Sequence, residues 1–174
     1  MIDERLSFCD FISSDRTLHG SRRQKGDKIT DLLMYEEGAI LKSIDRSTLL
    51  IVEFKKPGRD DYKYGDSGKD PFHQVIETVK HIRQKNGLTA DDGTIHRFPE
   101  GTNIIAFIIA DITDKLSDIY DNHDMRRSWD HMGYFRYHKT YDVFIEAIGY
   151  DKLVLDAKKR NSAFFDILLH DLLA

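Results

Sequence analysis

The sequence predicts an α/β fold in which a mixed β-sheet is flanked by helices. The predicted strands at 49–54 and 103–110 carry the continuously apolar runs 49–52 and 104–110, a pattern typical of central strands that are buried on both faces. Between them, the segment that follows Pro71 repeats its apolar side chains with helical spacing. The order strand, helix, strand indicates a βαβ crossover. We expect residues 1–174 to form one domain, either alone or as a piece of a larger protein.

The composition narrows the class of protein. Hydrophobic residues make up 40% and charged residues 32% of the chain, values typical of a soluble globular protein. No stretch approaches the roughly 20 apolar residues of a membrane span, and the N-terminus does not resemble a signal peptide. The single cysteine, Cys9, cannot form an internal disulfide, so we expect a cytoplasmic location and no membrane partner. A net charge of −4 leaves only local basic clusters to attract nucleic acid.

The first third of the chain predicts a helix followed by two strands. Apolar spacing predicts the helix over residues 3–14, and a basic loop follows at 19–26. Residues 29–35 predict a strand, which turn residues separate from the strand at 49–54. The short connections favour antiparallel pairing of these two strands.

The middle of the chain predicts a long loop and a well-defined helix start. Residues 56–70 are almost free of apolar side chains and form a candidate mobile lid over the end of the preceding strand. Asp70-Pro71 supplies a helix N-cap and a proline at the first helical position. We expect this helix to end near Gly87 and a polar loop to occupy residues 89–102.

The C-terminal part predicts a short helix, a hairpin and a long helix. The short helix is expected at 111–121, and residues 123–131 form a polar, mobile connection that carries the only tryptophan. Residues 133–138 and 141–148 predict a hairpin. A helix is expected over 153–173, with a break near its middle.

Two acidic side chains and a lysine form the candidate site. Asp31 lies among apolar neighbours in a predicted strand, where an unpaired carboxylate is costly. Glu53 and Lys55 project from one face because side chains alternate along a strand. If the two strands pair, Asp31 and Glu53 converge, and their oxygens suit Mg²⁺ or Mn²⁺. Such a metal would polarise a phosphodiester and lower the pKa of a water, while Lys55 would act on that water or on the phosphate. The plain alternative is an ion pair at the end of a strand.

The arrangement Asp31…Glu53-Phe54-Lys55 resembles the D…(D/E)-x-K signature of the PD-(D/E)XK nuclease superfamily. The resemblance covers residues 22–82, with Thr30 in place of the signature's proline, and implies a restriction endonuclease-like sheet. It implies Mg²⁺-dependent endonuclease activity on DNA, with Asp31, Glu53, Lys55 and Gln74 as catalytic residues and the first two as metal ligands. The implied DNA contacts are Arg22, Arg23, Lys25, Lys28 and Lys56.

A second resemblance covers nearly the whole chain. Residues 52–62, 70–75 and 150–165 are similar to a C-terminal module of large bacterial GHKL-type ATPase proteins. This resemblance implies an ATPase domain or subunit as partner and a role in antiphage defence or DNA processing. Two alternatives remain open: a non-catalytic nuclease-like domain that binds DNA or docks a protein, and a module that forms a homodimer.

Other chemistries receive less support. The eight histidines include no pair at the spacing of a helical zinc site, and one cysteine cannot support a structural zinc. The aromatic residues Tyr134, Phe135, Tyr137 and Tyr141 could stack on nucleic-acid bases. Packing of the hairpin on the core explains them more simply.

Overall fold

The main sheet of the molecule has seven strands and is mixed. The computed structural model describes residues 11–17, 29–36, 47–89, 95–99 and 101–173. In spatial order the strands are β1 (Phe11–Thr17), β2 (Ile29–Glu36), β3 (Thr48–Phe54), β6 (Asn103–Ile109), β9 (Val143–Ile148), β8 (Gly133–His138) and β7 (Arg126–Arg127).

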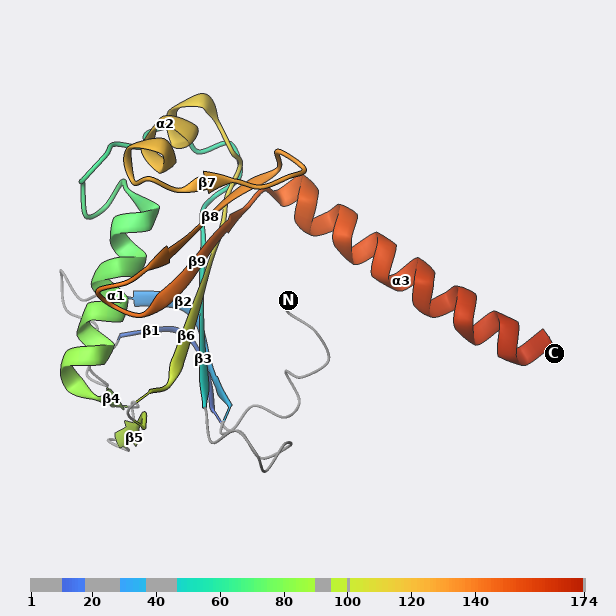
Figure 1. Ribbon diagram of the computed structural model, residues 1–174, viewed down its shortest axis with the longest axis horizontal. Coiled ribbons are helices and arrows are strands. Elements are labelled where there is room, and N and C mark those ends of the chain that lie inside the picture. Colours follow the sequence, from blue (N-terminus) through green and yellow to red (C-terminus); the bar gives the residue numbers. More distant parts are fainter. Residues whose placement is uncertain (1–10, 18–28, 37–46, 90–94, 100, 174) are drawn as a thin grey trace.

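The strands pair in two antiparallel groups around a parallel centre. β1, β2 and β3 form an antiparallel meander, and β7, β8 and β9 form a second one. β6 lies between the groups and is parallel to both β3 and β9. Helix α1 (Pro71–Lys85) connects β3 to β6, so it is the crossover that the sequence predicts. The prediction of a mixed sheet flanked by helices is confirmed (Figure 1).

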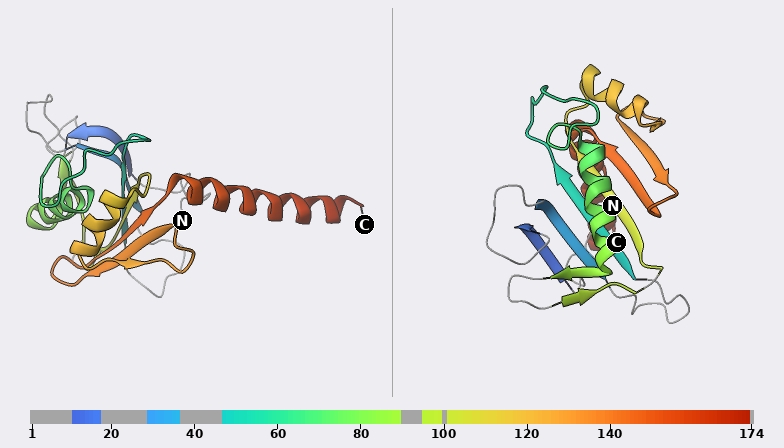
Figure 2. Two further views of the ribbon diagram at one scale, coloured as in Figure 1. Left: turned by 90° about the horizontal axis from the view of Figure 1, so that it is seen from above. Right: turned by 90° about the vertical axis from the view of Figure 1, so that its left-hand side faces the viewer.

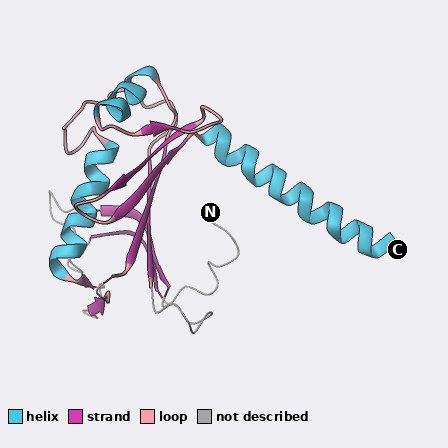
Figure 3. Ribbon diagram, viewed as in Figure 1, coloured by secondary structure: helices cyan, strands magenta, loops and turns pink. Residues whose placement is uncertain are grey.

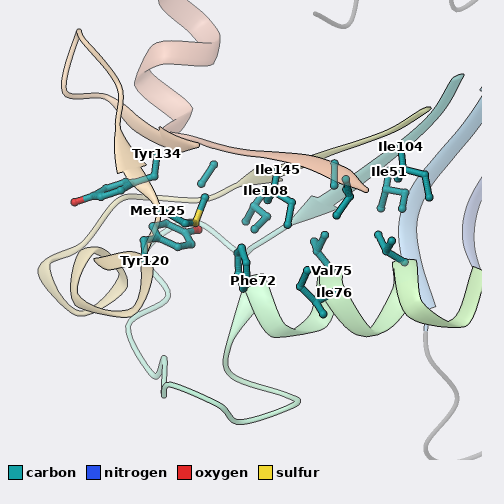
Figure 4. Packing of buried hydrophobic residues seen from close by; sticks show 14 of the residues in the cluster. Ile51, Phe72, Val75, Ile76, Ile104, Ile108, Tyr120, Met125, Tyr134 and Ile145 are labelled. Atoms are coloured by element: carbon teal, nitrogen blue, oxygen red, sulfur yellow. The ribbon is translucent and has the colours of Figure 1, made fainter. Parts of the chain in front are cut away.

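Two helices cover one face of this sheet. α1 lies along the sheet. α2 (Asp114–Asn122) lies above the N-terminal end of α1 (Figures 1 and 2). Alternate residues of the central strands point to these helices because side chains change face at every position. Figure 4 shows how Ile51, Ile104 and Ile108 of the sheet meet Val75 and Ile76 of α1.

The opposite face is covered differently. Val52, Phe107 and Ile109 form a second buried cluster, against which Tyr150 and Leu153 pack from the start of the third helix. That helix, α3 (Tyr150–Leu173), then extends away from the sheet (Figure 3). None of the helices in the described part of the chain is long and apolar enough to cross a membrane.

The structure corrects the expected helix at residues 3–14. Residues 11–14 belong to β1, which pairs with β2 in the register Phe11↔Tyr35. The apolar spacing of so short a segment does not separate helix from strand, and pairing with β2 decides the outcome. Residues 3–10 lie outside the described residues.

Smaller corrections concern the elements that follow. The expected loop at 89–102 contains β5 (Ile95–Arg97), which pairs with β4 (Gly87–Thr89) as a separate two-stranded sheet. Asn86, with φ of 50°, takes the left-handed cap of α1. A Cβ on Gly87 would lie 2.3 Å from the carbonyl oxygen of His96, so the pairing of β4 with β5 requires glycine there. α3 runs unbroken, without the expected interruption near its middle.

Candidate active site

The register of β2 and β3 brings Asp31 beside Glu53. Leu32 pairs with Val52 and Leu33 with Ile51, so the next pair along this antiparallel ladder is Asp31 and Glu53. By alternation both carboxylates lie on the face of Leu33 and Ile51, the face covered by α1. The Oδ2 atom of Asp31 accepts a hydrogen bond from the backbone nitrogen of Phe54 at 2.6 Å. The charge of Asp31 also acts on Glu53, so the two side chains lie near each other at the end of β3.

Lys55 joins the strand end to α1. Its side chain is only 5% exposed, and its Nζ donates to Oε1 of Glu53 at 2.5 Å. The same Nζ also donates to Oε1 of Gln74, in the first turn of α1. Gln74 in turn donates from Nε2 to the carbonyl oxygen of Ser67 at 3.0 Å. Two of the three N–H donors of the ammonium are thus directed at Glu53 and Gln74.

Burial makes the charge of Glu53 costly. Loss of hydration is the largest influence, and it raises the pKa of Glu53 above its ordinary value of 4.5. The carboxylate of Asp31 adds to this rise, whereas Lys55 and Arg59 oppose it without cancelling it. Glu53 therefore carries a carboxylate that an additional cation would stabilise.

The loop after β3 forms an ordered wall of the site. Arg59 donates from Nε to Asp61 at 2.6 Å and from a terminal nitrogen to the carbonyl oxygen of Gly68 at 3.1 Å. Backbone hydrogen bonds link Lys63 to Lys69 and close the loop on itself. Residues 56–70 therefore form the expected loop, and this loop has its own hydrogen-bond network.

A buried carboxylate fixes the start of α1, and hence the place of Gln74. Asp70 is fully buried, and its Oδ1 caps the helix by accepting from the backbone nitrogen of His73 at 3.0 Å. Its Oδ2 accepts from the backbone nitrogen of Gly65 at 2.8 Å and pairs with Nε2 of His123 at 2.7 Å. Burial alone would raise the pKa of Asp70, but these hydrogen bonds outweigh it and lower the pKa below 3.8.

Sequence reasoning did not identify two residues that act on the site. Arg59 influences Glu53 electrostatically, and its only signal was its place in the basic stretch after β3. Tyr150 donates its hydroxyl to the carbonyl oxygen of Lys55 at 2.7 Å. Nothing in the sequence could signal this contact, because 95 residues separate the partners.

The expected DNA contacts are placed only in part. Lys56 is exposed beside the site. The other four, Arg22, Arg23, Lys25 and Lys28, lie outside the described residues.

The carboxylates of Asp31 and Glu53 fit a hard divalent cation that keeps much of its own hydration water. In the described part of the chain, no three or more His, Cys, Asp and Glu side chains are grouped to hold a metal. Mg²⁺ is commonly held by one or two carboxylates, with waters and substrate phosphate completing its shell. Asp31 and Glu53 provide two such carboxylates.

A separate cavity of about 620 Å³ lies at the opposite end of the sheet. Its lining includes Leu49, Ile82, Arg83 and Arg97, and neither Asp31 nor Glu53 contributes to it. Arg83 is tied there to the carbonyl oxygens of Thr102, Tyr141 and Asp142. This hollow is therefore not the cavity of the candidate active site.

Comparison with known proteins provides no relative. No family model matches the chain, and no curated protein or solved structure shows significant similarity to it. The geometry of the site is thus the basis for any functional assignment.

Proposed function

We propose that the chain is a Mg²⁺- or Mn²⁺-dependent nuclease that hydrolyses phosphodiester bonds in DNA. The observation that supports this proposal most is the convergence of Asp31, Glu53, Lys55 and Gln74 at one end of the sheet. Two adjacent carboxylates with a buried ammonium provide a cation site next to a fixed positive charge. A phosphodiester needs both, since its negative charge increases during attack by water.

Each side chain has a distinct role in this proposal. Asp31 and Glu53 would hold the metal, which when bound supplies polarisation of the phosphate and a more acidic water. Lys55 places its ammonium in a site shielded from water, where its remaining N–H would donate to a phosphate oxygen or a water. Gln74 orients the ammonium and is itself held by the carbonyl oxygen of Ser67. Gln74 is therefore a positioning residue.

A cleavage assay tests the proposal. The wild-type chain is incubated with linear and circular DNA in the presence of Mg²⁺, Mn²⁺ or EDTA. Asp31→Asn, Glu53→Gln and Lys55→Met remove one charge each, and we expect each to lower the cleavage rate at least about 100-fold. Lys139→Met is the control, because Lys139 is exposed in the turn between β8 and β9, at the opposite end of the sheet from the site. Cleavage that survives in Asp31→Asn and Lys55→Met, or that persists in EDTA, would refute the assignment.

One observation favours a second candidate, a non-catalytic module that docks a protein. The start of α3 packs on the sheet through Tyr150 and Leu153, and this 24-residue helix then extends away from the sheet. A projecting helix is a common means of attachment to another domain or to a second copy of a chain. In that case Lys55 would merely neutralise Glu53. Sizing of the chain in solution, alone and with an ATPase partner, distinguishes this candidate if the cleavage assay is negative.

A further inference from the structure

Trp129 is displayed to solvent to an unusual degree. Its side chain is 96% exposed, the highest value among the large hydrophobic side chains of the described residues. Tryptophan is normally well buried, because its large ring gains much from leaving water. An indole held almost entirely in water is thus a candidate contact for a partner molecule.

The turn that carries this ring, residues 128–132, is held by its own hydrogen bonds. The backbone nitrogen of Ser128 donates to the carbonyl oxygen of Gly133 at 2.9 Å. The Oδ1 atom of Asp130 accepts from the hydroxyl of Ser128 at 2.6 Å and from the backbone nitrogen of Met132 at 3.0 Å. The expected connection at 123–131 thus contains β7 and most of this hydrogen-bonded turn. A pre-ordered turn loses little conformational entropy when its ring meets a partner.

The 128–132 turn lies at the same end of the sheet as the candidate active site. Oδ2 of Asp130 pairs with Nζ of Lys152 at 2.5 Å, in the first turn of α3. The hydrogen bond from Lys152 is the main reason that the pKa of Asp130 lies well below its usual range. Tyr150, two residues earlier on α3, holds the carbonyl oxygen of Lys55. Through Lys152 and Tyr150, the first turn of α3 therefore contacts both the 128–132 turn and the end of β3 that carries the candidate site.

Two arginines accompany the ring. Arg126 and Arg127 form β7, the edge strand of the sheet, and both are exposed. Arg127 reaches the carbonyl oxygen of His131 at 3.4 Å, which places its guanidinium alongside the turn. A guanidinium alongside the turn that carries an exposed indole, with a second exposed arginine preceding it in β7, matches a nucleic-acid strand, in which phosphates alternate with flat bases.

We propose that Trp129 stacks on an unpaired base of a nucleic-acid strand and that Arg126 and Arg127 contact its phosphates. This inference rests on the proposed nuclease function and names its substrate class, a nucleic acid with a single-stranded segment next to the cut. An unpaired base offers a free face to the ring, whereas a base inside a duplex must first be unstacked. The position of the turn at the same end of the sheet as the proposed nuclease site favours nucleic acid over a protein partner.

Intrinsic fluorescence measures this contact directly, because Trp129 is the only tryptophan of the chain. The wild type is titrated in EDTA with a single strand, a blunt duplex of the same sequence and a duplex with a single-stranded tail. We expect the emission to be quenched by the single strand and the tailed duplex, and much less by the blunt duplex. EDTA separates binding from metal-dependent cleavage.

Anisotropy of a labelled single strand provides the variant data. Trp129→Ala should weaken binding about 5- to 150-fold, the usual effect of one lost base stack. Arg126→Ala and Arg127→Ala should each lower the dependence of affinity on salt by roughly one phosphate contact. Ile95→Ala is the matched control, since Ile95 is 62% exposed on β5, at the other end of the sheet. All four positions are exposed, so the variants should keep the circular dichroism of the wild type.

The outcomes separate this inference from the nuclease proposal. If Asp31→Asn retains the quenching but loses cleavage, both the base contact and the nuclease proposal are supported. Quenching without cleavage in any protein supports the base contact and refutes the nuclease. The base contact alone is overturned if cleavage depends on Asp31 but the wild-type emission does not change on titration and Trp129→Ala binds as tightly as the wild type. Equal quenching by the blunt duplex overturns the unpaired base as the target, and binding to none of the three probes overturns the whole inference.

Discussion

Replacement of Lys55 by methionine tests whether the ammonium neutralises Glu53. The substitution keeps the length of the side chain and removes the charge that lies 2.5 Å from Oε1 of Glu53. At that distance, an effective dielectric constant of about 20 corresponds to roughly 6–7 kcal/mol of attraction. Loss of hydration by the two groups cancels much of it, and the raised pKa of Glu53 shows that burial outweighs the attraction there.

We therefore expect Lys55→Met to lower the free energy of unfolding by about 2–4 kcal/mol at neutral pH without metal, since Glu53 is left buried without a counter-charge. The double variant Lys55→Met with Glu53→Gln should recover to within about 1 kcal/mol of the wild type, because no unpaired charge remains. Lys56→Met, at the exposed neighbouring position, should change stability by less than about 0.5 kcal/mol.

Urea denaturation of these variants in EDTA supplies the measurement. The loss in Lys55→Met should shrink as the pH falls, because Glu53 then becomes protonated and needs no partner. A loss below about 1 kcal/mol at neutral pH would contradict this account, as would a loss that is equal at acidic pH or a double variant no better than the single one.

Three further predictions concern neighbouring groups. The raised pKa of Glu53 means that its contribution to stability is fully present below about pH 4.5 and is lost as the pH rises through the folded-state pKa. The free energy of unfolding of the metal-free wild type should therefore fall over this pH window in urea denaturation. Glu53→Gln removes this titration, so the fall should be smaller in that variant, although Lys55 then lacks its carboxylate partner. Asp70 has a lowered pKa, so its contribution to stability is present above pH 3.8 and is lost as the pH falls through the folded-state pKa. Asp70→Ala should lower the free energy of unfolding by about 2–4 kcal/mol at neutral pH and by little in acid. An unchanged urea midpoint would contradict its capping role. Tyr150→Phe removes the hydrogen bond to Lys55 and should cost about 0.5–1.5 kcal/mol of stability, whereas Tyr137→Phe, whose hydroxyl bonds the exposed Asp142, should cost less in the same assay.

The central part of the fold could be predicted from the sequence because it depends on local patterns. A strand that is buried on both faces must be continuously apolar, and this identifies β3 and β6. The start of α1 was predictable because Asp70-Pro71 satisfies the free backbone groups of a first helical turn. The period of two in strands also made the meeting of Asp31 and Glu53 predictable, once the two strands were assumed to be antiparallel neighbours.

Only the tertiary structure decided the remainder. β1 is a strand because β2 pairs with it, although its own apolar spacing equally suits a helix. The contact of Asp70 with His123 joins residues that are 53 positions apart, and that of Lys55 with Tyr150 joins residues 95 positions apart. No local pattern encodes such partners. The sequence by itself determined which groups carry charge near the end of β3. Chain topology decided which of them are buried and paired, because the ends of strands meet only when the sheet is assembled.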